Sequence, residues 1–255
     1  MAPFMGGYIL FLTNYGYSTL YLAVGVAGVT AFIIALFFVI ERKSSEPQNV
    51  GAKAATDRMF HGWLKVAKKR EIQIVGFIQT SQYYVFGTVE FFLVGYLAEV
   101  VRLDPFSIGV IMGSQVIALI LARPLMGRIS DRTGRRIPII TGSIISSLVL
   151  AAFPFSGHFP TLLLLSAGYG LGFAIVISST SPLTCEMAPS NLLGTSLGFL
   201  STMMDVGQTL GPIISGIILA ITLQYTALFY SLSLLSILST IAFTLSKTAK
   251  KSAAV

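Results

Sequence analysis

The sequence predicts an all-α polytopic membrane protein with seven transmembrane helices. Of its 255 residues, 54% are hydrophobic and only 11% are charged, and the mean hydropathy is +0.81, whereas soluble domains carry about 25% charged residues. A bilayer core of about 30 Å requires roughly 20 apolar residues in a helix. The segments that satisfy this requirement are 18–40, 72–97, 105–126, 137–155, 160–183, 193–221 and 224–246.

The distribution of positive charge predicts the orientation. All but one of the 17 Lys and Arg residues lie in segment 41–70, in region 123–136 or in the tail 247–255, and the exception is Arg102. Cytoplasmic loops collect Lys and Arg, so we expect a multi-pass protein of the plasma membrane whose 41–70 linker and C-terminus are cytoplasmic. The net charge of +7 is explained by this topology and does not indicate a nucleic-acid partner.

The first forty residues repeat a later part of the chain. Residues 2–12 are apolar but too short to span a bilayer. Residues 2–10 align with 211–219, so that Pro3 and Gly7 stand where Pro212 and Gly216 stand in the later copy, and both copies continue into another apolar segment and a basic stretch. We interpret them as two parallel repeats, the first mostly absent. Chance similarity between apolar segments is the alternative.

Residues 41–70 form the one long polar segment. Glu41 to Ala55 has the Ser, Pro, Gln, Asn and Gly content of a flexible linker. After Thr56 and Asp57, apolar residues recur at helical spacing, with basic residues largely off that face. This pattern is typical of a helix in the membrane interface, and a plain tether is the alternative.

A basic motif, GRISDRTGRR, occupies residues 127–136 between two apolar segments. The glycines permit close helix approach and a tight reversal. An acid among guanidinium groups can cap a facing helix terminus, and arginines bind phosphates or carboxylates through paired hydrogen bonds. The residues of this loop that we select as functional candidates are Gly127, Asp131, Arg132, Gly134, Arg135 and Arg136.

This motif resembles the signature loop of the major facilitator superfamily, G-x-x-x-D-R-x-G-R-R, which lies in a cytoplasmic turn between two spans. Resemblance to the family implies that 1–40 holds the end of helix 5 and helix 6 of an incomplete N-terminal half. It also implies that 71–246 is the C-terminal six-helix bundle, helices 7 to 12. In the family such a loop is a latch between the halves, and a mere topology anchor is the alternative.

Two further patterns resemble the family. The spacing G-x-x-x-G-P-x-x-x-G is similar to the glycine–proline motif of helix 5 or helix 11, and we expect it to pack helices through Gly207, Gly211, Pro212 and Gly216. The residues after Glu186 resemble the loop that ends helix 10, where members often carry an arginine just before a glycine. Leu193 stands at that position here, so the sequence offers Glu186 no such local arginine.

Acidic side chains inside a span are functional candidates, because a charge at the bilayer centre costs roughly 2.5–3.5 kcal/mol on insertion scales. Glu90 lies in the middle of 72–97, and Asp205 lies within 193–221. A carboxyl group away from water holds a proton more readily, which suits Glu90 for proton coupling; a simple hydrogen bond to substrate is the alternative. The predicted substrate or proton pathway comprises Gln79, Tyr83, Glu90, Gln115, Asp205 and Gln208.

These observations predict secondary active transport of a small organic solute by alternating access. The coupling ion is a proton or another ion; no other cofactor and no metal site is expected, because His61 and His158 stand at no ligand spacing. No catalytic set is visible, so enzyme activity is not expected. The expected partners are the bilayer, the substrate, and the missing N-terminal half or a second copy.

Two alternatives remain open at the level of the sequence. One is a half-size membrane protein that works only as a dimer. The other is a non-transporting, seven-helix receptor-like protein, against which the repeat and the signature motif argue. As a truncated chain the protein is expected not to transport alone, and neither the substrate nor the direction of transport follows from the residues.

Overall fold

The computed structural model describes residues 2–12, 17–38 and 62–246, and these residues are helical or lie in short connections, as the sequence predicts. Residues 62–67 form a helical turn that leads into the bundle. The remaining elements are α1 (Ala2–Leu12), α2 (Tyr17–Phe38), α4 (Arg70–Glu99), α5 (Pro105–Thr133), α6 (Arg136–Ala152), η1 (Phe153–Phe155), α7 (Phe159–Met187), η2 (Ser190–Leu192), α8 (Leu193–Thr222) and α9 (Tyr225–Leu245).

The described helices are those of a multi-pass membrane protein. Six segments are long and apolar enough to cross a bilayer: Ser18–Leu36, Pro105–Thr133, Arg136–Phe155, Phe159–Met187, Ser190–Thr222 and Tyr225–Leu245. The seventh predicted span, 72–97, corresponds to α4, a helix of 30 residues. Its length suffices, but polar residues such as Gln79, Gln82 and Glu90 make it less apolar than the others, which is expected of a helix that carries a polar site.

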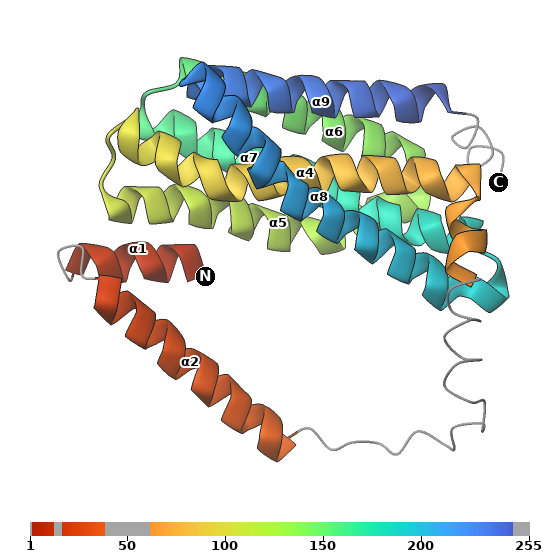
Figure 1. Ribbon diagram of the computed structural model, residues 1–255, viewed down its shortest axis with the longest axis horizontal. Helices are drawn as coiled ribbons and strands as arrows, with labels where there is room; N and C mark the ends of the chain where they lie inside the picture. The colour runs from red at the N-terminus through yellow and green to blue at the C-terminus, as the bar shows by residue number, and fades with distance from the viewer. Residues whose placement is uncertain (1, 13–16, 39–61, 247–255) are drawn as a thin grey trace.

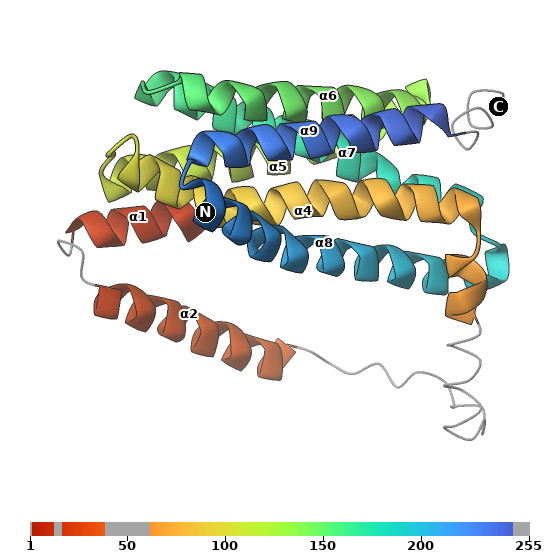
Figure 2. The ribbon, with the colours of Figure 1, turned by 45° about the horizontal axis from the view of Figure 1, so that its top comes forward.

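Helices α4 to α9 pack as one bundle (Figures 1 and 2). α4 packs against α8, α9 and α7, whereas α7 also contacts α5 and α6, and α6 contacts α9. The largest buried cluster joins Val89 and Leu93 of α4 to Tyr169 of α7 and Phe229 of α9. α4 and α7 are therefore the helices around which the others are arranged.

Small and polar residues bring α4, α6 and α9 together. Gln82 of α4 donates a hydrogen bond from Nε2 to Oγ of Ser143 in α6 at 3.2 Å. Ser233 of α9 donates to the carbonyl of Ser147 in α6 at 2.9 Å. Close approach through small residues and interhelical hydrogen bonds is how helices associate where lipid supplies no hydrophobic driving force.

α8 crosses α4 in backbone contact through glycine (Figure 1). A Cβ on Gly207 would lie 2.2 Å from the carbonyl oxygen of Thr80, and one on Gly211 would lie 2.3 Å from that of Tyr84. Thr80 also donates a hydrogen bond to the carbonyl of Met203 at 3.0 Å. Gly216 is in looser contact, since its Cβ would meet Phe92 at 3.5 Å.

α1 lies against α5, whereas α2 diverges from the bundle (Figure 2). A Cβ on Gly7 would lie 2.6 Å from the carbonyl oxygen of Pro105, and the rings of Tyr8 and Phe106 meet edge to face with centroids 6.3 Å apart. The apolar window of α2 buries none of its residues. An exposed apolar helix of this kind requires lipid or another protein surface around it.

The end of the 41–70 linker packs on the bundle. The apolar side of residues 62–67 presents Val66, which is fully buried with Ile72 and Phe199, and Trp63, whose ring meets that of Phe199 edge to face at 5.5 Å. Protein therefore covers this part of the predicted interfacial helix. Residues 39–61, which hold the predicted cap and flexible linker, and the predicted tail 247–255 lie outside the described residues.

The turn in the structure is shorter than the turn predicted at 127–136. α5 continues through Gly127 and Asp131 to Thr133, and α6 begins at Arg136. The reversal occurs at Gly134, whose φ of 84° is a conformation that glycine adopts readily. The expectation of close helix approach at Gly127 was wrong for the described chain, because an added Cβ would have no atom within 4 Å. That side of α5 lies beyond the helices that pack on it.

Candidate functional site

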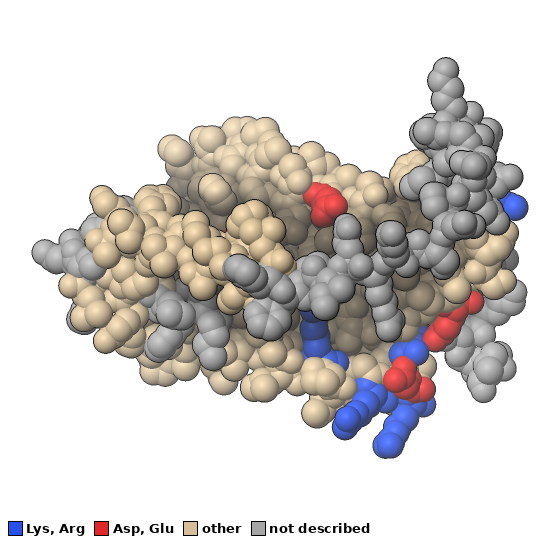
Figure 3. All heavy atoms as spheres, turned by 90° about the horizontal axis from the view of Figure 1, so that it is seen from below, with Lys and Arg blue, Asp and Glu red and all other residues tan. Residues whose placement is uncertain are grey.

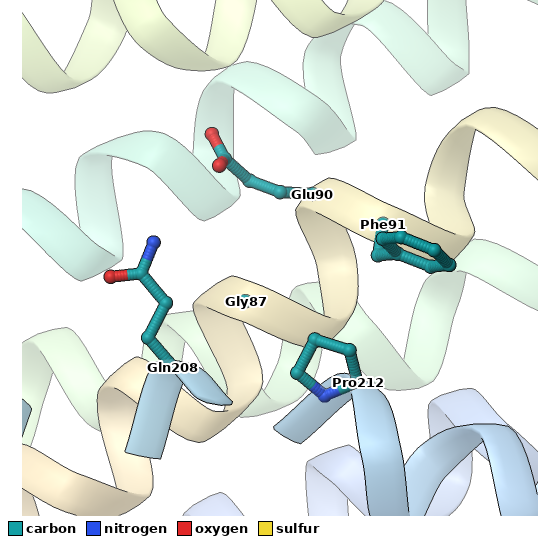
Figure 4. A pocket seen from close by; sticks show the side chains of 5 residues that line it. All are labelled: Gly87, Glu90, Phe91, Gln208 and Pro212. Carbon is teal, nitrogen blue, oxygen red and sulfur yellow. The ribbon is translucent and has the colours of Figure 1, made fainter. Parts of the chain in front are cut away.

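A hollow of about 320 Å³ lies between α4 and α8 and is lined by Gly87, Glu90, Phe91, Gln208 and Pro212. Figure 3 shows one face of the molecule with an acidic side chain beside a recessed area and further acidic and basic side chains gathered toward one end. In Figure 4, Glu90 and Gln208 extend into the same open space from two different helices.

Glycine and proline shape this hollow. Pro212 lies inside α8 and has no N–H, so the carbonyl of Gln208, one turn earlier, lacks its usual helical donor. A Cβ on Gly87 would lie 2.7 Å from this oxygen. The absence of a side chain at Gly87 lets α4 approach the freed carbonyl, where a Cα–H contact can offset part of the lost hydrogen bond.

Glu90 combines a charged group with an apolar setting. Its neighbours Val89 and Leu93 are buried in the core, at 1% and 0% exposure, while the Glu90 side chain faces the hollow (Figure 4). A carboxylate here can hold a cation or exchange a proton, and Gln208 adds a neutral amide that donates and accepts hydrogen bonds.

Aromatic rings connect α4 to α7 beside Glu90. Phe86, one turn before Glu90, stacks on Phe173 of α7 with centroids 4.4 Å apart and planes inclined by 8°. Tyr83 meets Phe173 edge to face at 5.2 Å, and Tyr169 stacks on Phe173 with centroids 6.3 Å apart. Phe173 and Tyr169 are 2% and 0% exposed, so these rings pack α4 against α7 behind the hollow.

Tyr83 and Asp205 form a second polar group, toward the same end as the basic motif. The Tyr83 hydroxyl interacts electrostatically with Arg123 of α5 and with Asp205 of α8. Tyr83 and Asp205 were predicted for the pathway, whereas Arg123 was not. Arg123 lies within the helix that ends in the motif, and its position one turn before Gly127 was the available signal.

Gln79 and Gln115, also predicted for the pathway, do not line the hollow. Gln79 is 5% exposed and Gln115 is 1% exposed. Gln115 lies where α5 touches α7, since a Cβ on Gly170 would be 2.2 Å from the carbonyl of Gln115. Helical periodicity predicts that Gln79 and Glu90 lie on similar sides of α4, but it does not show where neighbouring helices close over that side.

Arg135 is the centre of the loop at 127–136. Its Nη1 pairs with Oδ1 of Asp131 at 2.5 Å and donates to Oγ of buried Ser130 at 3.2 Å, while Nε donates to Oε1 of Glu186 at 2.9 Å. Ser179 of α7 donates to Ser130 at 2.8 Å. Burial alone lowers the pKa of Arg135, but the hydrogen bonds and charges of Glu186 and Asp131 raise it on balance.

Arg136 connects the same loop to the last helix, because its Nη2 donates a hydrogen bond to the carbonyl of Thr244 in α9 at 2.8 Å. Arg132 is exposed. Through Arg135 and Arg136 the loop therefore joins α5, α6, α7 and α9 at one end of the bundle. Among the described residues, no group of three or more His, Cys, Asp or Glu could hold a metal ion.

Comparison with known proteins gives one family match. The family model described as Major Facilitator Superfamily matches residues 75–254. Multidrug resistance protein Stp of Mycobacterium tuberculosis is 30% identical over 112 residues, which are 43% of this chain and 21% of that protein. A Lactococcus lactis homologue of the multi-drug resistance efflux pump PmrA is 30% identical over 98 residues, which are 38% of this chain and 24% of that protein.

Quinolone resistance protein NorA of Staphylococcus aureus is 25% identical over 110 residues, which are 43% of this chain and 28% of NorA. The aligned part thus spans between about a fifth and about three tenths of the length of these three relatives.

Proposed function

Because the chain belongs to the major facilitator superfamily, a family of membrane transporters, we propose that it provides one wall of the substrate cavity of a secondary active carrier. The carrier moves a small organic molecule by alternating access and is coupled to protons. The observation that carries this proposal is the position of Glu90, an acidic residue in mid-helix that faces a hollow beside Gln208.

The chemistry of Glu90 supports exchange between a proton and a cation. In a membrane protein a carboxylate without a partner is costly, so the group favours either a bound proton or a bound positive charge. Substrate and proton then compete for one site, and competition for one site is enough to couple two fluxes in opposite directions. The same site suits another small coupling cation, such as Na⁺.

We propose lipophilic organic cations as the substrate class. Phe91 in the hollow provides apolar and cation–π contacts, while Glu90 favours positive charge. The names of the relatives, two multidrug resistance proteins and a quinolone resistance protein, support organic compounds as substrates, and the name of the efflux pump among them supports export as the direction.

The hollow requires a second unit to become a closed cavity. α1 already lies on α5 as a separate element next to this bundle, which supports a partner of similar helices, either an N-terminal half or a second copy. We propose that the basic motif and the 41–70 linker face the cytoplasm of the plasma membrane. Native mass measurement separates the partners, because a second copy doubles the chain mass of 27.4 kDa.

Uphill transport and exchange together test the coupling. Vesicles that contain the protein expressed from its complete gene are loaded with tetraphenylphosphonium, and a pH gradient or a Na⁺ gradient is imposed. We expect Glu90→Gln to abolish proton-driven uphill movement, while counterflow exchange survives at higher tetraphenylphosphonium concentrations, because Phe91 and Gln208 still line the site. Glu99→Gln, a change of another acid on α4, is the matched control and keeps both. Loss of both activities in Glu90→Gln contradicts proton coupling through Glu90. Uphill transport by the wild type that a Na⁺ gradient drives and a pH gradient does not drive contradicts it as well.

A further inference from the structure

Three buried hydroxyls of the described residues, those of Ser146, Tyr169 and Ser196, have no hydrogen-bond partner, and the phenol of Tyr169 is the largest of these side chains. Tyr169 of α7 is 0% exposed, and its OH has no hydrogen-bond partner among the described residues. Buried polar groups are almost always paired, and an unpaired one is costly and requires an explanation. A phenylalanine would fill the same space without that cost.

The charged group that acts on this hydroxyl is Glu90. The Tyr169 phenol and the Glu90 carboxylate interact electrostatically. The ring of Tyr169 belongs to the same buried cluster as Val89 and Leu93, which flank Glu90 on α4. It also stacks on Phe173, which stacks on Phe86 one turn before Glu90. The Tyr169 phenol therefore lies on the core side of the stretch of α4 whose Glu90 side chain lines the hollow.

Among the described residues, Glu90 is the charged side chain that acts on the Tyr169 hydroxyl. Arg123 of α5 and Asp205 of α8 both act on Tyr83, two turns before Glu90. Gln208 of α8 is neutral, and α9 carries no acidic or basic residue. The acid of α7, Glu186, is at the far end of that helix and pairs with Arg135.

We propose that Tyr169 is a positioning residue for Glu90: its phenol donates a hydrogen bond to the ionised carboxylate when the Glu90 side chain turns from the hollow toward α7. Glu90 then has two positions. In the hollow it binds a proton or the substrate cation, and against Tyr169 it rests as a carboxylate after either has left. A hydrogen bond to the charged form favours that form, so Tyr169 sets the pH at which Glu90 takes up its proton. This inference rests on the proposed protonation of Glu90.

A titration that requires no transport tests the proposal. The protonated carboxyl band of Glu90 is followed by infrared difference spectroscopy on the purified 255-residue chain, and Glu90→Gln identifies the band. We expect Tyr169→Phe to move the midpoint to higher pH by about one unit or more, because the stabilising donor is lost. Tyr84→Phe, which removes a phenol bonded to Ser215 at 3.2 Å, leaves the midpoint in place.

A second substitution keeps the test valid if Tyr169→Phe fails to fold. Incorporation of 3-fluorotyrosine at position 169 retains the ring and makes the hydroxyl a stronger donor, so the midpoint moves to lower pH. A midpoint that is unchanged in folded Tyr169→Phe or in the fluorinated protein overturns the role of Tyr169 and leaves the proposed function intact. The absence of any titrating band that Glu90→Gln removes overturns both.

Discussion

Arg135, next to the start of α6, and Glu186, near the end of α7, are joined by a hydrogen bond of 2.9 Å from Nε to Oε1. The Arg135 side chain is only 14% exposed, whereas those of Asp131 and Glu186 are 61% and 48% exposed. The guanidinium is thus largely buried, whereas the two acidic side chains that pair with it lie at the surface. Its planar fork reaches Ser130 and both acids at once, a geometry that a lysine does not reproduce.

Replacing Arg135 should destabilise the bundle. In Arg135→Lys the charge remains but the fork is lost, so buried Ser130 loses its donor from the loop; we expect a loss of about 1–3 kcal/mol in stability, read as a lower midpoint of thermal unfolding in detergent. Arg132→Lys, at an exposed position of the same loop, serves as control and changes stability by less than about 0.5 kcal/mol. Equal midpoints for the two variants contradict the role assigned to Arg135.

The start of α5 should depend on pH through Asp104. Ser107 donates from Oγ to Asp104 at 2.6 Å and from its backbone N–H at 3.0 Å, and these hydrogen bonds, the side-chain one first, hold the pKa of Asp104 below its ordinary value. A lowered pKa stabilises the folded state above the unfolded pKa, about 3.9, and that contribution is lost as pH falls through the lower folded value.

We therefore expect Asp104→Asn to remain folded, since Asn also caps helices, but to lose less stability than wild type between about pH 4 and the lower folded pKa. Unfolding by denaturant at a series of pH values measures this. Asp104→Ala lacks the cap and should be less stable by about 1 kcal/mol at neutral pH. Parallel pH profiles for the wild type and Asp104→Asn refute the cap's contribution.

The contact between α8 and α4 predicts a difference between two glycines of one helix. Gly207→Ala places a methyl group 2.2 Å from the Thr80 carbonyl, so backbone must move and stability should fall by about 1–3 kcal/mol. At Gly198 an added Cβ has no atom within 4 Å, so Gly198→Ala should be neutral or stabilise by up to about 1 kcal/mol. Thermal unfolding of both variants tests this, and a harmless Gly207→Ala argues against the close contact.

Much of the fold follows from the sequence because hydrophobic length and charge report directly on the bilayer. Segments 105–126 and 160–183 were found for this reason, although the helices that contain them extend to Thr133 and Met187. Polar helix ends carry no hydropathy signal, so the boundaries were short at those ends. The motif at 127–136 was interpreted as a turn because glycine and arginine are frequent there, yet only Gly134 needs a turn conformation.

The candidate site was partly predictable. Glu90 and Gln208 were selected because polar residues in a span are exceptional, and both line the hollow. The pairing of Arg135 with Glu186 joins residues that lie 51 positions apart, a relationship that no local pattern contains. Tyr169 and Phe173 were passed over because aromatic residues in an apolar helix give no signal until their neighbours are known.

The most direct measurement of the central claim is proton release on substrate binding. Tetraphenylphosphonium is added to purified, weakly buffered protein near neutral pH, and released protons are read with an indicator dye. Because cation and proton compete for one carboxyl group, we predict release of up to about one proton per bound cation, retained in Glu99→Gln and absent in Glu90→Gln. Bound cation without proton release in the wild type, or equal release in Glu90→Gln, would contradict coupling through Glu90.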